Sequence, residues 1–460
     1  MFLDRRREMD VLRRRHESPR AECLVLYGRR RVGKSELADR FVEETGGIRL
    51  LAREQSEKLQ LEAFSGELAA FFEDEVLEAQ PFTSWDAFFA YVARKAENRR
   101  LVLCLDEFPY LVSANRSLPS ILQDHWDRRL SRGRLFLILC GSSIGMMEGL
   151  LGAKSPLYGR RTGQIRLRPL PFSGVLEWTG GDLEKAVEVQ AVFGSTPACL
   201  LEHDPRRGIL QNIRNAFLRE DALLFRDVEF LLRQELRELR NHFSILSAIA
   251  RGRTRLSEIV NDTGLDRGVV TRYLAILSDL HLVEREVPVT ERKPDRSRKG
   301  LYRLSDDYFR FWFRFVHPSI QRVERGRVDE IVEGRIGPAL SGFIGPVFER
   351  VVREAVESLG EAGTLPFRPE RIGRWWDRRE EIDVVALGEG GGRILFGEVK
   401  WSRGVDASRL LRALHRKTSG VARGRGPVDE HFLLVARSFK RKAPGAMCLG
   451  LRDLKGALER

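Results

Sequence analysis

The most constraining feature of this chain is an apolar stretch that runs directly into a glycine-rich loop and then into a helical stretch. The stretch 23–27 is apolar, and the loop after it fits the pattern G-x-x-x-x-G-K-[ST]. In such a strand–loop–helix unit the backbone N–H groups curl around phosphates, while Lys34 reaches the β- and γ-phosphates and Ser35 holds Mg²⁺. An ordinary glycine-rich turn is the less favoured alternative in this setting. The predicted nucleoside triphosphate site comprises Gly28, Arg29, Arg30, Arg31, Val32, Gly33, Lys34 and Ser35.

A second strand-like stretch, 100–105, ends in two carboxylates, Asp106 and Glu107. Acidic residues at the end of a strand have an evident use beside a phosphate-binding loop. We expect Asp106 to bind Mg²⁺ through water or Ser35, and Glu107 to polarise the attacking water. The alternative is a strand that is merely capped by solvated acids, which the phosphate-binding loop makes less favoured.

A third strand-like stretch, 134–140, ends in Gly-Ser-Ser. A polar residue there could sense the γ-phosphate, and Ser142 is slightly favoured over Ser143. The loop after it carries Arg160 and Arg161. An arginine there could act as an arginine finger, which stabilises charge on the transferred phosphoryl group. A solvated basic turn is the alternative. The sequence also leaves open whether either arginine acts within its own subunit or across the interface of a homo-oligomer.

These motifs together resemble the archaeal-type ATPase family of AAA+ and signal-transducing P-loop NTPases. The family carries the same G-R-R-R-x-G-K-[ST] loop, a D-E-[FW] strand end, a G-S-S strand end and a P-L-Y-G-R-R segment, here at 156–161. The stretch 194–198 matches its helical-lid signature G-G-T-P-A, with Ser195 in place of the second glycine. The resemblance implies ATP as the nucleotide and an α/β fold: a doubly wound parallel sheet with a helical lid.

The charge of the chain favours a polyanionic partner. The sequence has 79 Lys and Arg against 66 Asp and Glu, a formal net charge of +13, and its pI is near 9.8. Nucleic acid, and DNA in particular, is the favoured partner. A GC-rich genome that favours Arg codons is the blander explanation.

Three sequence features predict a cytoplasmic protein that does not interact with a membrane. No stretch approaches the roughly 20 uninterrupted apolar residues of a membrane span. The first residues lack the apolar segment of a secretory signal. The five cysteines are scattered without metal-ligand spacing, as in a reducing compartment.

The middle of the chain has helical periodicity in three consecutive stretches. Apolar residues recur in 243–250, in a stretch that begins at Leu256, and in 267–280. Thr263-Gly264 ends the second helical stretch and separates it from the third. Asp266 is placed to cap the third helix. The period and the short break predict a helix-turn-helix.

Two strand-like stretches, 282–287 and 300–304, follow and enclose a basic tip at 291–299. A helix-turn-helix with a basic hairpin is a winged helix. It could read DNA, or it could only pack against the nucleotide domain and report its state. In the DNA-binding alternative, the major groove and the phosphates would be contacted by Arg267, Thr271, Arg272, Arg296, Arg298 and Lys299.

A dense aromatic run, 308–315, comes next. Such a run could stack on bases. The favoured interpretation is an amphipathic helix that anchors the winged helix to its neighbour.

The last part of the chain predicts a hairpin that carries acidic and basic side chains. The strand-like stretches 381–387 and 394–401 are joined by a glycine-rich turn. Because side chains alternate along a strand, Glu398 and Lys400 project from one face, and Asp383 can lie opposite them. Two carboxylates and one lysine on one sheet face suit metal-dependent phosphodiester hydrolysis.

In that interpretation Asp383 and Glu398 bind Mg²⁺ with help from a backbone carbonyl near Val399. Lys400 would orient or activate water and offset charge in the transition state. Glu349, on a preceding helix, could complete the site.

This arrangement resembles the PD-(D/E)xK nuclease superfamily, with Asp383 as its first acid and 398–400 as its second half. Ile382 replaces the proline of the motif. The stretches 348–349 and 374–377 match the nuclease-like C-terminal domain that is usual in this ATPase family. A solvated acidic–basic hairpin is the alternative.

The predicted domains are a P-loop ATPase core at 1–175, a helical lid at 176–238, a winged helix at 239–318 and a nuclease-like α/β domain at 319–460. The leading hypothesis is an ATPase whose nucleotide state controls a DNA-associated winged helix and a Mg²⁺-dependent nuclease domain. The first alternative is an ATP-switched DNA-binding regulator whose nuclease fold is catalytically silent. The second is an ATPase switch with a structural winged helix and a protein partner.

Overall fold

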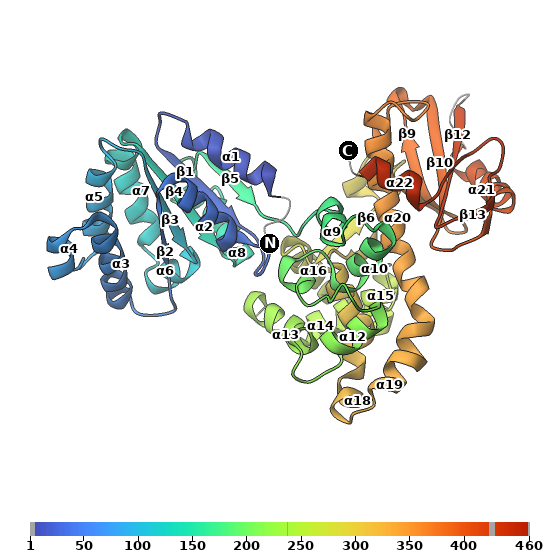
Figure 1. Cartoon of the computed structure of the whole chain (residues 1–460), viewed down its shortest axis with the longest axis horizontal. Coiled ribbons are helices and arrows are strands. Elements are labelled where there is room, and N and C mark those ends of the chain that lie inside the picture. The colour runs from blue at the N-terminus through green and yellow to red at the C-terminus, as the bar shows by residue number, and fades with distance from the viewer. Residues whose placement is uncertain (1–4, 237, 423–427, 459–460) are drawn as a thin grey trace. The chain divides into compact units, whose positions relative to one another are not determined.

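The computed structural model of the chain describes residues 5–236, 238–422 and 428–458. It divides into two compact units, Met1–Leu170 and Pro171–Arg460. The predicted domain boundaries at 175/176, 238/239 and 318/319 stay predictions. The structure groups the residues predicted for the lid, the winged helix and the C-terminal domain in the second unit, together with 171–175 of the predicted core (Figure 1).

The first unit is built on a parallel sheet in the order β2-β3-β4-β1-β5. All neighbouring strands in it are parallel, as predicted for a doubly wound fold. β4 lies between β1 and β3, so the ends of these three strands meet at one edge of the sheet. The strands are β1 (Glu22–Tyr27), β2 (Ile48–Leu51), β3 (Leu101–Asp106), β4 (Leu135–Gly141) and β5 (Gly163–Arg166).

Apolar side chains on both faces of this sheet explain its burial. β1 directs Cys23 and Val25 to a cluster with the helices of one face, and Leu24 and Leu26 to a second cluster on the other face. The first face is covered by α3 (Glu57–Phe72), α5 (Trp85–Lys95), α6 (Phe108–Ala114) and α7 (Leu118–Arg128), and the second by α1 (Arg6–His16) and α2 (Lys34–Thr45). The short helices α4 (Glu75–Ala79) and α8 (Ile144–Leu151) complete the unit.

The second unit begins with a group of helices where the lid was predicted. The glycine of the predicted lid signature, Gly194, has φ +68° and ends α10 directly before the Ser-Thr-Pro-Ala stretch. The helices are α9 (Phe172–Trp178), α10 (Leu183–Phe193), α11 (Pro197–Leu200), α12 (Ile209–Phe217) and α13 (Leu223–Glu235).

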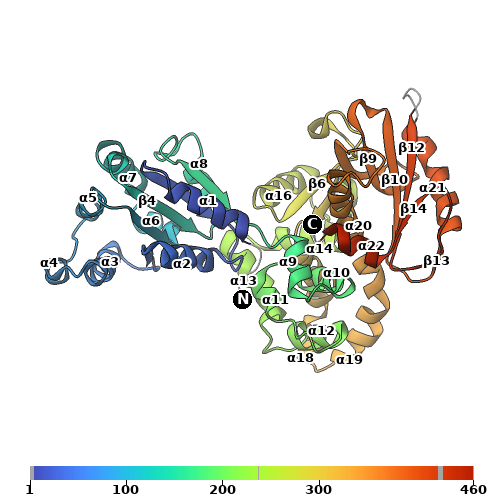
Figure 2. The same ribbon diagram turned by 45° about the horizontal axis from the view of Figure 1, so that its top comes forward.

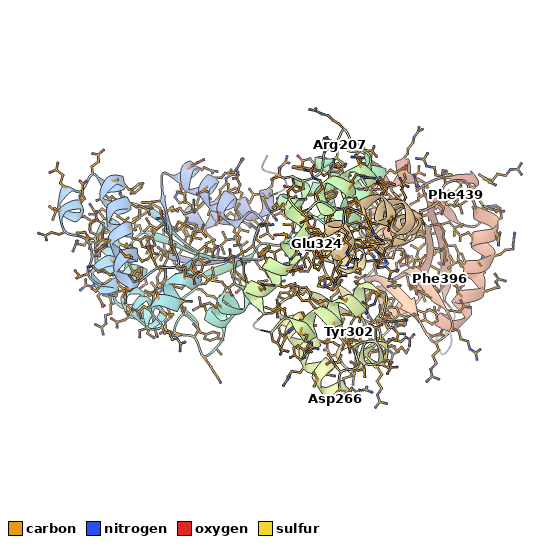
Figure 3. The ribbon with its side chains drawn as sticks, turned by 90° about the horizontal axis from the view of Figure 1, so that it is seen from below. Arg207, Asp266, Tyr302, Glu324, Phe396 and Phe439 are labelled. Atoms are coloured by element: carbon orange, nitrogen blue, oxygen red, sulfur yellow. The ribbon has the colours of Figure 1, made fainter. Side chains whose placement is uncertain are left out.

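The predicted winged-helix elements are present as three helices and an antiparallel hairpin. Asp266, labelled in Figure 3, occupies the N-cap position of the third helix, but its side chain does not accept the capping hydrogen bond that the sequence suggested. The elements are α14 (Arg240–Ala250), α15 (Leu256–Thr263), α16 (Arg267–Asp279), β6 (Val283–Glu286) and β7 (Leu301–Leu304).

The aromatic run after the hairpin is a packing element, as favoured by the sequence. It forms α17 (Asp307–Phe311) and a π-helical turn, Trp312–Val316. Its six aromatic residues are at most 2% exposed, and the Trp312 indole donates a hydrogen bond to the Phe225 carbonyl at 2.8 Å. Side chains buried to this degree do not present their rings to bases, so the base-stacking alternative is wrong.

The C-terminal sheet has the order β14-β12-β10-β9-β8. The predicted hairpin is the antiparallel pair β9 and β10, and β10, β12 and β14 are parallel. The long helix α20 (Gly337–Glu361) packs against this sheet and against α22 (Figure 2). The remaining elements are α18 (Ile320–Glu324), α19 (Val328–Ile331), β8 (Arg371–Trp376), β9 (Glu381–Leu387), β10 (Arg393–Lys400), β11 (Val405–Asp406), α21 (Ala407–Ala422), β12 (Asp429–Ala436), β13 (Phe439–Arg441), β14 (Met447–Leu449) and α22 (Leu451–Leu458).

The structure also bears on the expectations about membrane-spanning segments and about the cysteines. None of the described helices combines the length and apolar character that a bilayer crossing requires. All five cysteines lie among the described residues and are buried, and none of them forms a disulfide.

The packing role of the aromatic run predicts a strong effect of truncation. Trp312→Ala should lower the free energy of unfolding by about 3–5 kcal/mol, because it leaves a cavity and removes the hydrogen bond from the indole to the Phe225 carbonyl. Denaturant unfolding followed by circular dichroism measures the change. Phe230 is 61% exposed, so Phe230→Ala is the matched control and should stay within about 0.5 kcal/mol of wild type. Equal stability of the two variants would contradict the packing role.

Candidate functional site

The glycine-rich loop lies between the end of β1 and the start of α2, so Lys34 and Ser35 are the first residues of the helix. Gly33 precedes the helix with φ +94°, a conformation that side chains disfavour. At Gly28 a Cβ atom would lie 2.2 Å from the carbonyl oxygen of Leu167. Both glycines are therefore required by the local structure, which directs the N-terminus of α2 toward the loop.

The Lys34 ammonium is held inside the loop. The residue is 6% exposed, and its Nζ donates a hydrogen bond to the Arg29 carbonyl at 3.0 Å. Burial lowers the pKa of Lys34, while Glu107 and Asp106 are among the nearby groups that oppose this shift. A buried cation with a single backbone partner can readily exchange that partner for a phosphate oxygen.

Ser35 and Asp106 come together as the sequence predicted. The Ser35 hydroxyl donates to Asp106 Oδ2 at 3.0 Å, although 71 residues separate the two. Arg49 on β2, which the sequence analysis did not single out, also donates to this oxygen, at 2.9 Å. Its only sequence signal is a charged residue within an otherwise apolar edge strand. A hydroxyl and a carboxylate side by side supply the oxygen ligands that Mg²⁺ prefers.

Glu107 and Ser142 also meet, because β4 lies beside β3. The Ser142 hydroxyl lies 2.9 Å and 2.8 Å from the two Glu107 carboxylate oxygens. Glu107 has φ +51°, a left-handed conformation that is uncommon for a residue with a side chain. This conformation turns the chain from β3 into α6. Glu107 directly follows Asp106, and strained backbone of this kind is often found at functional sites.

The loop arginines and the predicted arginine fingers lie in different places. Arg30 donates to the Tyr110 hydroxyl at 2.9 Å, next to the Asp106 strand end. Arg160 forms an exposed ion pair with Asp127 at 2.9 Å, and Arg161 donates to the Leu151 carbonyl at 3.0 Å. Both residues precede β5 in the chain. Thr162, which lies between them and β5, donates its backbone N–H to the Cys23 carbonyl at the start of β1.

Since the loop Gly28–Ser35 follows the opposite end of β1, the structure does not bring Arg160 or Arg161 to it. A role for either in another subunit stays a prediction.

In the C-terminal sheet, the hairpin assembles the predicted carboxylates and lysine. Lys400 Nζ lies 2.9 Å from Glu398 Oε1 and 3.8 Å from Asp383 Oδ2. Asp383 also accepts a hydrogen bond from the Val399 backbone N–H at 2.9 Å. The sequence analysis missed Lys417 on α21, whose ammonium lies 2.9 Å and 2.8 Å from the two Glu398 oxygens. Two lysines therefore neutralise Glu398, which is 4% exposed.

A different set of three carboxylates has the spacing for a cation. One oxygen each of Glu349, Glu381 and Asp383 lies within 4.8 Å of the others. Burial and the nearby Asp383 carboxylate raise the pKa of Glu349 to about 7, and burial followed by Glu398 raises that of Asp383. The acidic oxygens and their mutual repulsion fit a divalent cation such as Mg²⁺. Glu381 was missed, although its spacing of two from Asp383 on one strand could have indicated it.

Arg374 on β8 is a cation that contacts two of these three carboxylates. Its guanidinium forms an ion pair with Glu381, lies 4.0 Å from Glu349, and reaches Glu286 of the winged-helix hairpin at 3.3 Å. The hairpin of the winged helix is thus connected to the carboxylates by one side chain.

The connector between β6 and β7, which is the wing, also packs on the edge strand β8. The Val289 N–H donates to the Arg374 carbonyl at 2.8 Å, and the Trp376 indole donates to the Lys299 carbonyl at 3.1 Å. Val289 is buried in the same core cluster as Trp375. The wing is therefore fixed to the C-terminal sheet.

The side chains predicted to contact DNA differ in the contacts that they already make within the protein. Arg267, Thr271 and Arg272 are exposed on α16, and Arg296 and Arg298 are exposed on the wing. The Thr271 hydroxyl already donates to the Arg267 carbonyl at 2.8 Å. Lys299 is engaged as well, because its ammonium pairs with Glu291 at 2.9 Å.

Three family models match the chain. A model of an ATPase domain predominantly from Archaea matches residues 2–197, and a model of the IclR helix-turn-helix domain matches residues 239–287. A model described as "Archaea bacterial proteins of unknown function" matches residues 312–413 and names no activity. The winged helix therefore has a DNA-binding type of helix-turn-helix, whereas the nuclease resemblance is not confirmed.

Similar proteins were found by sequence and by structure. The protein MJECL04 of Methanocaldococcus jannaschii is 33% identical over 450 residues, which is 97% of this chain and 98% of that protein. The ATP-binding protein MJ0423 of the same organism is 44% identical over 43 residues, or 9% of this chain and 73% of its own length.

The solved structures that are similar to this chain include two remote matches. The Walker-type ATPase PABY2304 of Pyrococcus abyssi has a TM-score of 0.48 at 20% identity, over 68% of this chain and 96% of that one. The Aeropyrum pernix ORC2 protein, in its ADPNP and ADP complexes, has a TM-score of 0.44 at 16% identity, over 72% and 95%.

The full-length match to MJECL04 joins the ATPase and helix-turn-helix matches into one conclusion. The chain belongs to an archaeal-type family of P-loop ATPases that carry a winged helix after the ATPase domain.

Proposed function

We propose that the first unit binds ATP with Mg²⁺ and hydrolyses it. The observation that carries this proposal is the pair of hydrogen bonds Ser35–Asp106 and Ser142–Glu107 at the edge where the glycine-rich loop lies. Ser35 and Asp106 would hold the ion, which when bound offsets charge on the β- and γ-phosphates.

Within that site each residue has a separate task. Lys34 would leave the Arg29 carbonyl for a phosphate oxygen. Glu107 would accept a proton from the attacking water. Ser142 holds the Glu107 carboxylate and would exchange this bond for one to the γ-phosphate.

Ser142→Ala should lower the rate of ATP hydrolysis by about tenfold or more, because the γ-phosphate loses the hydroxyl donor that would contact it during hydrolysis. Binding of a fluorescent ATP analogue should change little. Ser143 is the matched control, since it follows directly but its side chain makes no capping hydrogen bond to α8. Phosphate release under steady-state conditions measures both variants. Equal rates for Ser142→Ala and Ser143→Ala would remove Ser142 from the mechanism.

We further propose that the second unit binds DNA and hydrolyses phosphodiester bonds with a divalent cation, under the control of the nucleotide state. The exposed arginines of α16 and the wing support DNA contact. The clustered oxygens of Glu349, Glu381 and Asp383 support metal binding. Lys400, beside Asp383, would orient the attacking water and offset charge in the transition state.

One observation favours the second candidate, an ATP-switched DNA-binding regulator with a silent nuclease fold. Glu398, the second acid of the nuclease motif, has both carboxylate oxygens bound by Lys417 and one also bound by Lys400. Such pairing leaves fewer lone pairs on Glu398 for a cation.

A nuclease assay separates these two candidates. Wild type should cut DNA with Mg²⁺ or Mn²⁺, and Asp383→Ala and Glu381→Gln should each lose about a hundredfold or more of this activity, because both remove a metal ligand. Glu389→Gln changes an exposed carboxylate in the turn after β9 and should cut like wild type.

Crossing Asp383→Ala with Lys34→Ala, with and without ATP, tests the control by nucleotide. Cleavage that is the same in wild type and Asp383→Ala would exclude the nuclease. DNA binding that changes between ATP and ADP, without cleavage, would support the regulator.

A further inference from the structure

A cavity of about 790 Å³ lies within the second unit, apart from both sites described above. Its walls come from the start of α10, from the segment that contains β13, and from the start of α22. The segments that line it are 181–184, Arg403, 437–442, 450–453 and Lys455. Pockets of this size are typical of small-molecule sites.

The cavity is strongly basic. Its lining includes seven Lys or Arg side chains and three carboxylates. Among the described residues, Lys440, Arg441 and Arg452 have no ion partner, and all three are exposed. Lys440 and Arg452 come from different walls, β13 and α22, so their charges converge on the cavity from two elements.

The three carboxylates offset this charge only in part, because the seven cations outnumber them. Asp182 caps α10 by accepting a hydrogen bond from the Lys185 N–H at 3.1 Å. Asp453 accepts one from the Gly450 N–H at 2.9 Å. Glu184 binds two guanidinium groups, those of Arg403 and Arg437.

Glu184 thereby fixes arginines at the wall of the cavity. Arg403 lies 2.7 Å from Glu184 and keeps 67% of its side chain exposed. Arg437 is more enclosed, with its guanidinium carbon 4.8 Å from the centre of the Trp401 ring. Arginines held in place lose little entropy on binding, and their planar forks match phosphate oxygens.

Part of the lining is apolar. Leu183, Leu451 and Phe439 contribute, and Phe439 is half-buried on β13 (Figure 3). An aromatic ring beside several cations is the combination that accepts a base and its phosphate.

We propose that this cavity binds a phosphorylated nucleoside group. The group would be either a free mononucleotide or the phosphorylated end of a nucleic-acid strand. The phosphate would lie among Lys440, Arg441 and Arg452, and the base would stack on Phe439. The site is independent of the glycine-rich loop, which belongs to the other compact unit.

The test uses the full chain with Lys34→Ala, so that the glycine-rich loop does not bind the probe. Fluorescence anisotropy measures binding of a 3′-labelled 12-nucleotide DNA strand with either a 5′-phosphate or a 5′-hydroxyl. The 5′-phosphorylated strand should bind more tightly, and adding K440A/R452A should weaken it by about tenfold or more, to the level of the 5′-hydroxyl strand. R409A/R412A removes two exposed charges from α21 and is the matched control, which should stay within about twofold.

Competition with AMP separates the two sources. Displacement of the strand by AMP indicates a mononucleotide site, and its failure indicates a strand end. Equal binding of the two strands, together with no AMP binding to Lys34→Ala, would overturn the proposal. So would an equal loss in K440A/R452A and R409A/R412A.

Hydrogen exchange provides a measurement that does not depend on the variants. With the 5′-phosphorylated strand or AMP bound, the segments 437–442 and 450–455 should be protected, and unchanged exchange there would contradict the site. ATP hydrolysis by wild type and metal-dependent cleavage are read out separately. Failure of this proposal therefore leaves those activities unaffected.

Discussion

The pairing of buried charges is the constraint on which both candidate sites depend. Asp106 is 1% exposed and Glu398 is 4% exposed, and an unpaired carboxylate at such depth would be strongly destabilising. The chain meets this cost with cations from other elements. Arg49 on β2 neutralises Asp106, and Lys417 on α21 neutralises Glu398. The positions of the functional acids are thus fixed by partners that the motifs do not contain.

The same constraint links the winged helix to the carboxylate set of the C-terminal sheet. Arg374 is shared between Glu286 of the hairpin and the carboxylates Glu349 and Glu381. The backbone of the wing adds a hydrogen bond from Val289 to β8. A winged helix that is fixed in this way presents Arg296 and Arg298 at a constant position relative to Asp383.

Much of the first unit could be predicted because its signals are local. The loop motif lies between a strand and a helix, and the apolar runs that precede Asp106 and Ser142 are long enough to be read as strands. Parallel strands bring their carboxyl ends to one edge, so the meeting of Ser35 with Asp106 followed from the fold class. The hairpin of Asp383 and Glu398 was predictable for the same reason, because side chains alternate along a strand. The matches to the ATPase and helix-turn-helix models agree with these local signals.

Other parts of the sites had no local signal. Arg49, Lys417 and Arg374 are ordinary charged residues of a strand or helix in a chain that is rich in them. Arg160 and Arg161 had a motif, but the parallel pairing of β5 with β1 places their backbone beside the start of β1, whereas the glycine-rich loop follows the end of that strand.

The sequence by itself thus determined the strands that precede the site residues, the glycine-rich loop, the helix-turn-helix and the acids at the strand ends, because each depends on residues close together in the chain. Only the tertiary structure decided which charges neutralise these acids and where the wing lies. These contacts join residues far apart in sequence, and the burial of the groups they pair exists only after folding.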